Sequence, residues 1–193
     1  MSQAIAGFKL FEALPTLETP RLRLRPLAES DADDFHRMLG DPDVVRYVPM
    51  RQSMRLSDTR RVLADMLACY ARNVPAPWGV ERRADGRLLG MCGFQAWAPG
   101  PARAEFGFLF AREAWGQGYA REASRAVMAF AFGPMGVNRL EARTKLENLA
   151  ARRLLERLGL VHEGVLREHD RWKGQAHDLV LYAMLRREYQ PDP

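Results

Sequence analysis

The chain has 193 residues, of which 47% are hydrophobic, enough for one domain with a sizeable core and too few for two generous ones. Its 29 basic and 24 acidic side chains give a net charge of +5 and are interspersed, which suits an anionic ligand and argues against a nucleic-acid-binding function. The two cysteines have neither metal-type nor redox spacing, and no apolar run approaches membrane-spanning length. We therefore expect a single domain over residues 1–193, in the cytoplasm, without a membrane or nucleic-acid partner.

The first eighteen residues carry apolar side chains without a clean period, at Ile5, Phe8, Leu10, Phe11 and Leu14. They indicate an arm that packs either on the domain itself or on a partner subunit of a homodimer. Leucines and arginines then alternate from Arg21 to Leu27, which is typical of a half-buried strand ending at Pro26. This is the first strand that we predict.

Two amphipathic helices are expected next. Ser30 and Asp33 resemble a capping box, and the helix that they start ends before Gly40. Its apolar stripe consists of Phe35, Met38 and Leu39. The second helix has a longer apolar stripe opposite a charged face, and this stripe contains Val62, Leu63, Met66, Leu67 and Tyr70.

Strands and helices alternate in the rest of the chain. Residues 77–83 and 87–97 are predicted to be two strands joined by a hairpin turn. Period-two phenylalanines predict a strand that ends near Phe110, and helical spacing predicts a helix over residues 119–132. Beyond it we expect a strand through residues 140–144, a helix from 148 to 159 and two strands over about 161–172 and 178–188. The apolar stripe of the last helix, which we expect in the core, is Ala151, Leu154, Leu155 and Leu158.

Gly116 and Gly118 lie in the turn between the phenylalanine-rich strand and the following helix. Glycine lets the backbone approach a ligand closely, and a helix begins with unpaired N–H groups at the positive end of its dipole. Two glycines are also ordinary turn residues. The corner would fit a pyrophosphate, and the chain has neither a Gly-x-Gly-x-x-Gly strand-to-helix motif near its start nor a Gly-Lys-Ser/Thr loop.

The sequence of this corner, Trp-Gly-Gln-Gly-Tyr-Ala at residues 115–120, resembles the acyl-CoA pyrophosphate loop of the GNAT N-acetyltransferases. It is most similar to the form in ribosomal-protein-alanine N-acetyltransferases (RimJ/RimL-like) and their small-molecule relatives, although many members have Gln or Arg in place of Trp115. The resemblance covers nearly the whole chain, with further matches at residues 18–27, 147–151, 158–160, 163–167 and 181–182. It implies the GNAT fold, an α+β domain with a mixed, mostly antiparallel central sheet flanked by helices.

The resemblance also implies acetyl-CoA as cosubstrate and a primary amine as acceptor, either a small molecule or a protein N-terminus. Asn148 matches a position that contacts the pantetheine arm, although capping of the next helix explains an asparagine there as well. Variable loops at residues 41–57 and 97–104 are expected to select the acceptor. The residues expected to bind CoA are Phe108, Phe110, Trp115, Gly116, Gln117, Gly118, Tyr119, Ala120 and Asn148.

Two carboxylates are candidates for the base that such a reaction uses. Glu105 lies on the strand face opposite Phe106 and Phe108, and similar acetyltransferases use a glutamate at this position, often through water. Its structural alternative is an exposed or salt-bridged strand residue. Asp170 matches a glutamate assigned as base in the ribosomal-protein enzymes, and its alternative is a salt bridge with a neighbouring arginine.

The sequence identifies no group that would protonate the leaving thiolate. Members of the family have a serine at the position of Ala151 or a tyrosine at that of Leu155, and both are missing here. A catalytically silent acyl-CoA-binding module is therefore the alternative function. No metal is expected, because His162, His169 and His177 are widely spaced on separate strand segments.

Overall fold

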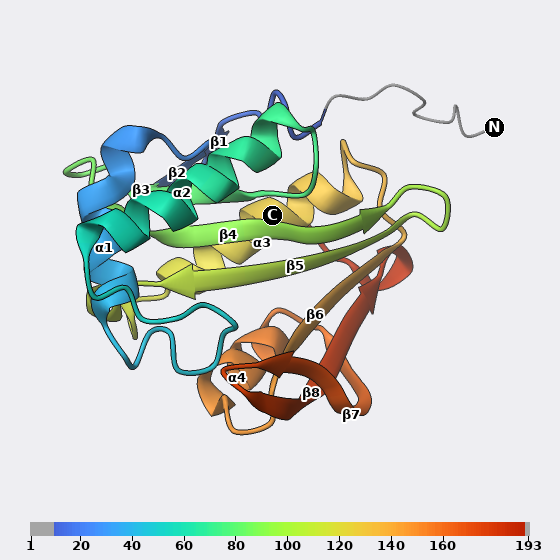
Figure 1. Ribbon diagram of the computed structural model, residues 1–193. Helices are drawn as coiled ribbons and strands as arrows, with labels where there is room; N and C mark the ends of the chain where they lie inside the picture. The colour runs from blue at the N-terminus through green and yellow to red at the C-terminus, as the bar shows by residue number, and fades with distance from the viewer. Residues whose placement is uncertain (1–9, 192–193) are drawn as a thin grey trace.

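The computed structural model describes residues 10–191, which form an eight-stranded sheet with helices on both faces (Figure 1). The strand order is β1-β2-β3-β4-β5-β6-β8-β7, and all neighbours are antiparallel except β5 and β6. The strands are β1 Leu17–Glu18, β2 Leu22–Arg25, β3 Pro77–Arg82, β4 Leu88–Ala98, β5 Arg103–Phe110, β6 Arg139–Lys145, β7 Val161–Trp172 and β8 Gln175–Leu185. The helices are α1 Ala32–Gly40, α2 Leu56–Ala71, α3 Tyr119–Phe132 and α4 Leu149–Arg157. None of these helices is long and apolar enough to cross a membrane.

The sheet separates two hydrophobic cores. Successive strand residues point to opposite faces, so Phe106 and Phe110 face the core beneath α3, whereas Leu109 faces the core beneath α1 and α2. Figure 1 shows α2 in front of β4 and α3 behind that strand. The α3 core includes Trp78, Phe94, Val127, Leu155 and Tyr182, and the other core includes Phe35, Leu39, Leu63 and Leu88.

β5 and β6 separate soon after they meet. Their parallel pairing covers three residue pairs, from Arg103 and Arg139 to Glu105 and Glu141. β5 continues to pair with β4 as far as Phe110, so its other edge over residues 106–110 has no strand partner within the described chain. In Figure 1, β6 turns away from β5 toward α4 and the β7–β8 hairpin. The two strands therefore diverge beyond Glu105, and residues of both line a cleft there.

The N-terminal arm packs on its own chain as far as the structure describes it. The apolar side chains at 10, 11 and 14 are buried in the α3 core, and the Phe11 N–H donates to Asn73 Oδ1 at 2.9 Å. Ile5 and Phe8 lie outside the described residues. Of the two alternatives for the arm, packing on the domain therefore holds for residues 10–14.

The predicted elements are present, with one additional strand and differences at several of their ends. The short strand β1 precedes the predicted first strand. Helix α1 begins after Asp31 instead of Ser30, because the Asp31 carboxylate accepts the Ala28 N–H at 2.8 Å and pairs with Arg25 at 2.7 Å, which closes a turn before the helix. The last strand ends at Leu185, and a 3₁₀ turn follows over Arg186–Glu188. The mixed, mostly antiparallel sheet is confirmed.

Candidate active site

The turn between β5 and α3 has the backbone that the sequence predicts for an anion-binding corner. Gly116 (φ 71°) and Gly118 (φ 79°) are both left-handed, a conformation that a residue with a Cβ adopts only at a cost. Gly118 immediately precedes α3, and no described side chain caps the helix there. The first N–H groups of this 14-residue helix are therefore available to a ligand, and the helix dipole favours an anion.

Arg21, just before β2, holds the corner in place. Its Nη1 donates to the Gln117 carbonyl at 2.9 Å, and its guanidinium lies 4.4 Å from the centre of the Tyr119 ring. Its Nε pairs with Glu122 at 2.6 Å, and Glu122 also accepts the Thr19 hydroxyl at 2.6 Å. Burial by itself would raise the pKa of Glu122, but the hydrogen bonds from Thr19 and Arg21 outweigh it and lower that pKa. The corner is thus tied to the sheet by a charged carboxylate.

The residues expected to bind CoA divide into exposed and supporting positions. Residues 116–118 are exposed and Trp115 is about half exposed, with its indole N–H donating to the Phe110 carbonyl at 2.9 Å. Phe110 and Tyr119 are buried in the core, and Ala120 is partly buried. Within the loop, only residues 115–118 present a surface to a ligand, and the buried side chains of Phe110 and Tyr119 support them from beneath.

A cavity of about 400 Å³ occupies the cleft between β5 and β6 and extends beneath α2. Glu105, Phe108, Asn148 and Asp170 all line it, so the structure brings together predicted residues from β5, β7 and the start of α4. Residues 47–50 of the first predicted acceptor loop also line it. Residues 97–104 do not, because they surround the β4–β5 turn at the other end of those strands.

Glu105 is 7% exposed and forms an ion pair with Arg143 on β6. Arg143 Nε donates to Glu105 Oε1 at 2.9 Å, and Arg143 Nη2 contacts Oε2. The hydrogen bonds to Glu105 raise the pKa of Arg143, so the guanidinium stays charged in the cavity wall. Arg143 is a charged cavity residue that the sequence reasoning missed. The sequence signal that could have identified it is the alternation along the strand. Arg143 lies on the face opposite the buried Leu140, Ala142 and Thr144, and a partly buried cation on that face needs a partner of opposite charge.

Asp170 lies near the same guanidinium but is solvent-exposed. Its Oδ1 accepts the Arg171 N–H at 2.9 Å, and its charge contributes to the raised pKa of Arg143. Arg143 also contacts the His169 ring. Two carboxylates from different strands thus share one arginine, and within residues 10–191 no three His, Cys, Asp or Glu side chains gather as a metal site would require.

Asn148 and the first turn of α4 form the other wall of the cleft. Asn148 Oδ1 accepts the Ala151 N–H at 3.2 Å, so it caps the helix, and its side-chain NH₂ can still donate to a ligand. Ala151 and Leu155 line the cavity and are buried. Leu154, predicted as core, is only partly buried because it lies at the edge of the buried face of α4.

Comparison with known proteins decides the family. The model of the acetyltransferase (GNAT) domain matches residues 21–161, which is more than half of the chain. The chain belongs to the GNAT acetyltransferase family. It is 31% identical over 172 residues to the uncharacterized N-acetyltransferase YoaA of Bacillus subtilis strain 168, over 89% of this chain and 97% of that protein.

Solved GNAT structures agree with this assignment. A GNAT-family acetyltransferase from Bacillus anthracis superposes with a TM-score of 0.80 at 25% identity, over 90% of this chain and 100% of that chain. RimL, a ribosomal alpha-N-protein acetyltransferase in complex with coenzyme A, superposes with a TM-score of 0.78 at 18% identity, over 89% and 98% of the two chains. At that identity the likeness to RimL concerns the fold. The GNAT fold and the acyltransferase class predicted from the sequence are confirmed.

Proposed function

We propose that this GNAT enzyme transfers the acetyl group of acetyl-CoA to a primary amine, through one active site in a single domain over residues 1–193. The carrying observation is the cleft between β5 and β6, which has two left-handed glycines before an uncapped helix start at one end and a cavity with two carboxylates at the other. A thioester on an anionic carrier and an amine could meet there. The shared fold of a RimL–coenzyme A complex supports acetyl-CoA as the donor.

Acetyl-CoA would bind along the open edge of β5. The pyrophosphate would accept hydrogen bonds from N–H groups of the loop at residues 116–120, beside the start of α3. The amides of the pantetheine arm would pair with backbone groups on the open edge of residues 106–109, as an added strand does. The NH₂ group of Asn148 would contact the same arm from α4.

The reaction requires a neutral amine, whose nitrogen attacks the thioester carbonyl carbon. The resulting tetrahedral intermediate collapses with cleavage of the C–S bond, and the amine nitrogen loses a proton. We assign Glu105 as the base, acting through a water molecule, because it is the buried carboxylate that lines the cavity where β5 and β6 separate. Asp170 is the second carboxylate of the cavity, and Arg143 orients Glu105.

The leaving thiolate must gain a proton, and two hydroxyl groups of the cavity wall could supply it. Thr144 lies on β6, on the same strand face as Ala142, and Tyr47 lies in the loop between α1 and α2. Neither hydroxyl is at the position of Ala151 or Leu155, where family members have the serine or tyrosine that donates the proton. Their presence weakens the argument for a silent acyl-CoA-binding module, which rests on the missing serine or tyrosine.

Thiol release separates the two functions. Purified protein is incubated with acetyl-CoA and a panel of primary amines and N-terminal peptides, and free CoA is measured with a thiol reagent against a no-amine blank. Amine-dependent release of CoA, together with a mass increase of one acetyl group on the amine, is expected. A protein that binds acetyl-CoA in calorimetry but releases no CoA with any amine is a silent binding module.

A further inference from the structure

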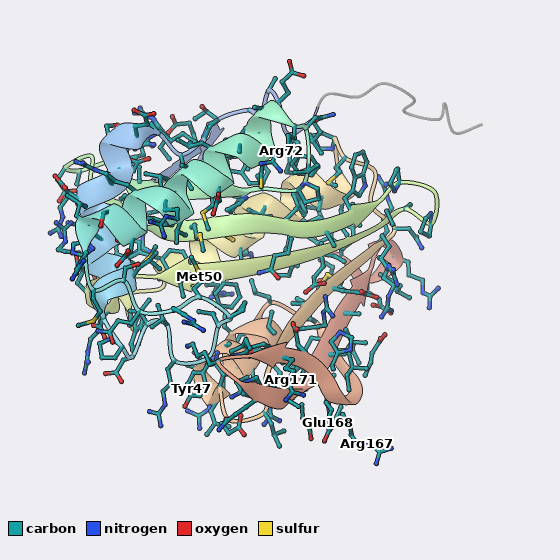
Figure 2. The ribbon with its side chains drawn as sticks, viewed as in Figure 1. Tyr47, Met50, Arg72, Arg167, Glu168 and Arg171 are labelled. Carbon is teal, nitrogen blue, oxygen red and sulfur yellow. The ribbon has the colours of Figure 1, made fainter. Side chains whose placement is uncertain are left out.

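The part of the cavity beneath α2 has a wall made almost entirely of apolar, sulfur-containing and proline side chains. Met66 and Cys69 come from α2 and Met91 from β4, and Met50 comes from the loop between α1 and α2. Figure 2 shows Met50 on that loop, close to β5. Pro75 and Pro77 complete this methionine wall, which consists of Met50, Met66, Cys69, Pro75, Pro77 and Met91.

The opposite wall is polar and its charges balance. Among the lining residues, the carboxylates Glu105 and Asp170 are matched by the cations Arg143 and Lys145. A polyamine or other multiply charged acceptor would need an excess of carboxylates, because each buried cation requires its own counter-charge. The cavity suits an acceptor with one amine, which meets Glu105, joined to an apolar body.

Gln95 supplies a neutral polar group at the boundary between the two walls. It is the extra residue of a bulge in β4, between the pairs Phe94–Phe106 and Ala96–Glu105. Its side-chain amide lies over Gly107, on the strand face that also carries Glu105, and it makes no hydrogen bond within residues 10–191. An amide in this position can accept a hydrogen bond from the acceptor's N–H group or donate one to a carbonyl beside it.

Two contacts hold the loop that carries Met50, so the wall is formed before a ligand arrives. Arg112, which follows β5, pairs with Asp43 at the start of the loop. Lys173, in the β7–β8 turn, donates to the Val45 carbonyl at 2.7 Å. Both contacts precede Met50, and after it the Ser53 N–H donates to the Leu39 carbonyl at 3.0 Å, so the loop is held on both sides of Met50. A wall held in this way selects by shape, because it does not have to be ordered when the acceptor binds.

We propose that the acceptor is a monoamine whose amino group is attached to a bulky apolar group, which packs on the methionine wall. This substrate class rests on the acetyl transfer proposed above. The amine belongs either to a small molecule or to a peptide whose first residue is large and apolar, because both present the same chemistry to the cavity.

The test compares amine acceptors that have similar basicity and differ in the group attached to the amine. Rates of CoA release are measured with 2-phenylethylamine, ethanolamine and spermidine, and with tetrapeptides that differ only in an N-terminal Met or Ser. We expect kcat/KM for 2-phenylethylamine to exceed those for ethanolamine and spermidine by about tenfold or more. The peptide pair identifies the source, since a preference for Met over Ser points to a protein N-terminus and equally poor peptides point to a small molecule.

Variants locate the preference on the wall. Met66→Gln keeps the length of the side chain and places an amide among the apolar groups, so it should lower kcat/KM for 2-phenylethylamine by about fivefold and leave ethanolamine unchanged. Ala64→Gln, on the exposed face of the same helix, should change neither rate. Acetyl-CoA affinity measured by calorimetry serves as the control for folding in both variants.

Three results would overturn the proposed class. Equal or faster turnover of ethanolamine or spermidine would show that the wall does not select the acceptor, while acetyl transfer itself would stand. An unchanged preference in Met66→Gln would place the acceptor elsewhere. Binding of acetyl-CoA without turnover of any amine would remove both this class and the proposed function.

Discussion

Replacement of Glu105 by glutamine removes a base and keeps the shape of the side chain. If Glu105 takes the proton from the attacking amine, Glu105→Gln should lower kcat by about tenfold or more at neutral pH, since a general base contributes roughly 10²–10⁴-fold. The affinity for acetyl-CoA should remain nearly intact. The Glu105 side chain projects from the face of β5 opposite Phe106, whereas the pantetheine arm is proposed to pair with backbone groups along the edge of the strand.

The same change weakens the ion pair with Arg143, and the size of that effect decides whether the kinetics can be interpreted. Glutamine keeps one acceptor oxygen and loses the second together with its charge. A charge-assisted hydrogen bond contributes about 1.5–3 kcal/mol, and the guanidinium is 29% exposed, so we expect a loss of about 1–2 kcal/mol. Domains of this kind are stable by roughly 5–15 kcal/mol, so the variant remains folded at 25 °C.

Initial rates of CoA release at saturating acetyl-CoA and over a range of pH, together with urea unfolding, measure both effects. Arg143→Gln is the matched variant, because it breaks the same pair and leaves the carboxylate in place. It should lose similar stability and retain more activity than Glu105→Gln. The assignment would be refuted if Glu105→Gln ran at the wild-type rate while Asp170→Asn was crippled, since the base would then belong to β7.

Four further variants test the corner and the strands around it. Gly118→Asp puts a carboxylate and a Cβ where the pyrophosphate should lie, so calorimetry should show acetyl-CoA affinity reduced by about fivefold or more; binding within about twofold of wild type would contradict the phosphate assignment. In β4, Gly93→Ala would place a Cβ 2.5 Å from the backbone of β3, and urea unfolding should show a loss of about 2 kcal/mol or more, whereas the Cβ of Gly107→Ala meets only the movable end of a side chain and should cost less than about 1 kcal/mol. Glu122 has a lowered pKa, so its contribution to stability is present above its ordinary value of 4.5 and is lost as the pH falls below it. The stability difference between wild type and Glu122→Gln should therefore shrink between pH 6 and pH 3, and a difference independent of pH would exclude this role.

Local patterns were sufficient for most of the fold. The helix over residues 119–132 was predicted with the bounds that it has, because its apolar side chains recur at helical spacing on a face that the sheet buries. The left-handed conformation at 116 and 118 was also predictable from local sequence, because glycine adopts a positive φ without the cost that a Cβ would add. The start of α1 was predicted incorrectly because Asp31 is engaged by Arg25, which no local pattern reveals.

The candidate site was only partly predictable. Glu105, Asp170 and Asn148 were identified by their positions in family motifs, and the structure places all three at one cavity. Arg143 was missed because its partner lies 38 residues away and on another strand. Residues 97–104, expected to help select the acceptor, do not line the cavity, because their distance from the cleft depends on the direction in which β4 and β5 run.

By itself, the sequence determined the strands and helices, the glycine corner and the membership of the GNAT family, because periodicity, turn chemistry and motif spacing are properties of neighbouring residues. The tertiary structure alone decided that β5 and β6 separate after Glu105, that Arg143 holds this carboxylate, and that methionines from α2, β4 and a loop form one wall. Each of these features joins segments far apart in the chain. Their contacts depend on strand order and on the packing of helices against the sheet, and those are set by the burial of the whole core rather than by any local stretch of residues.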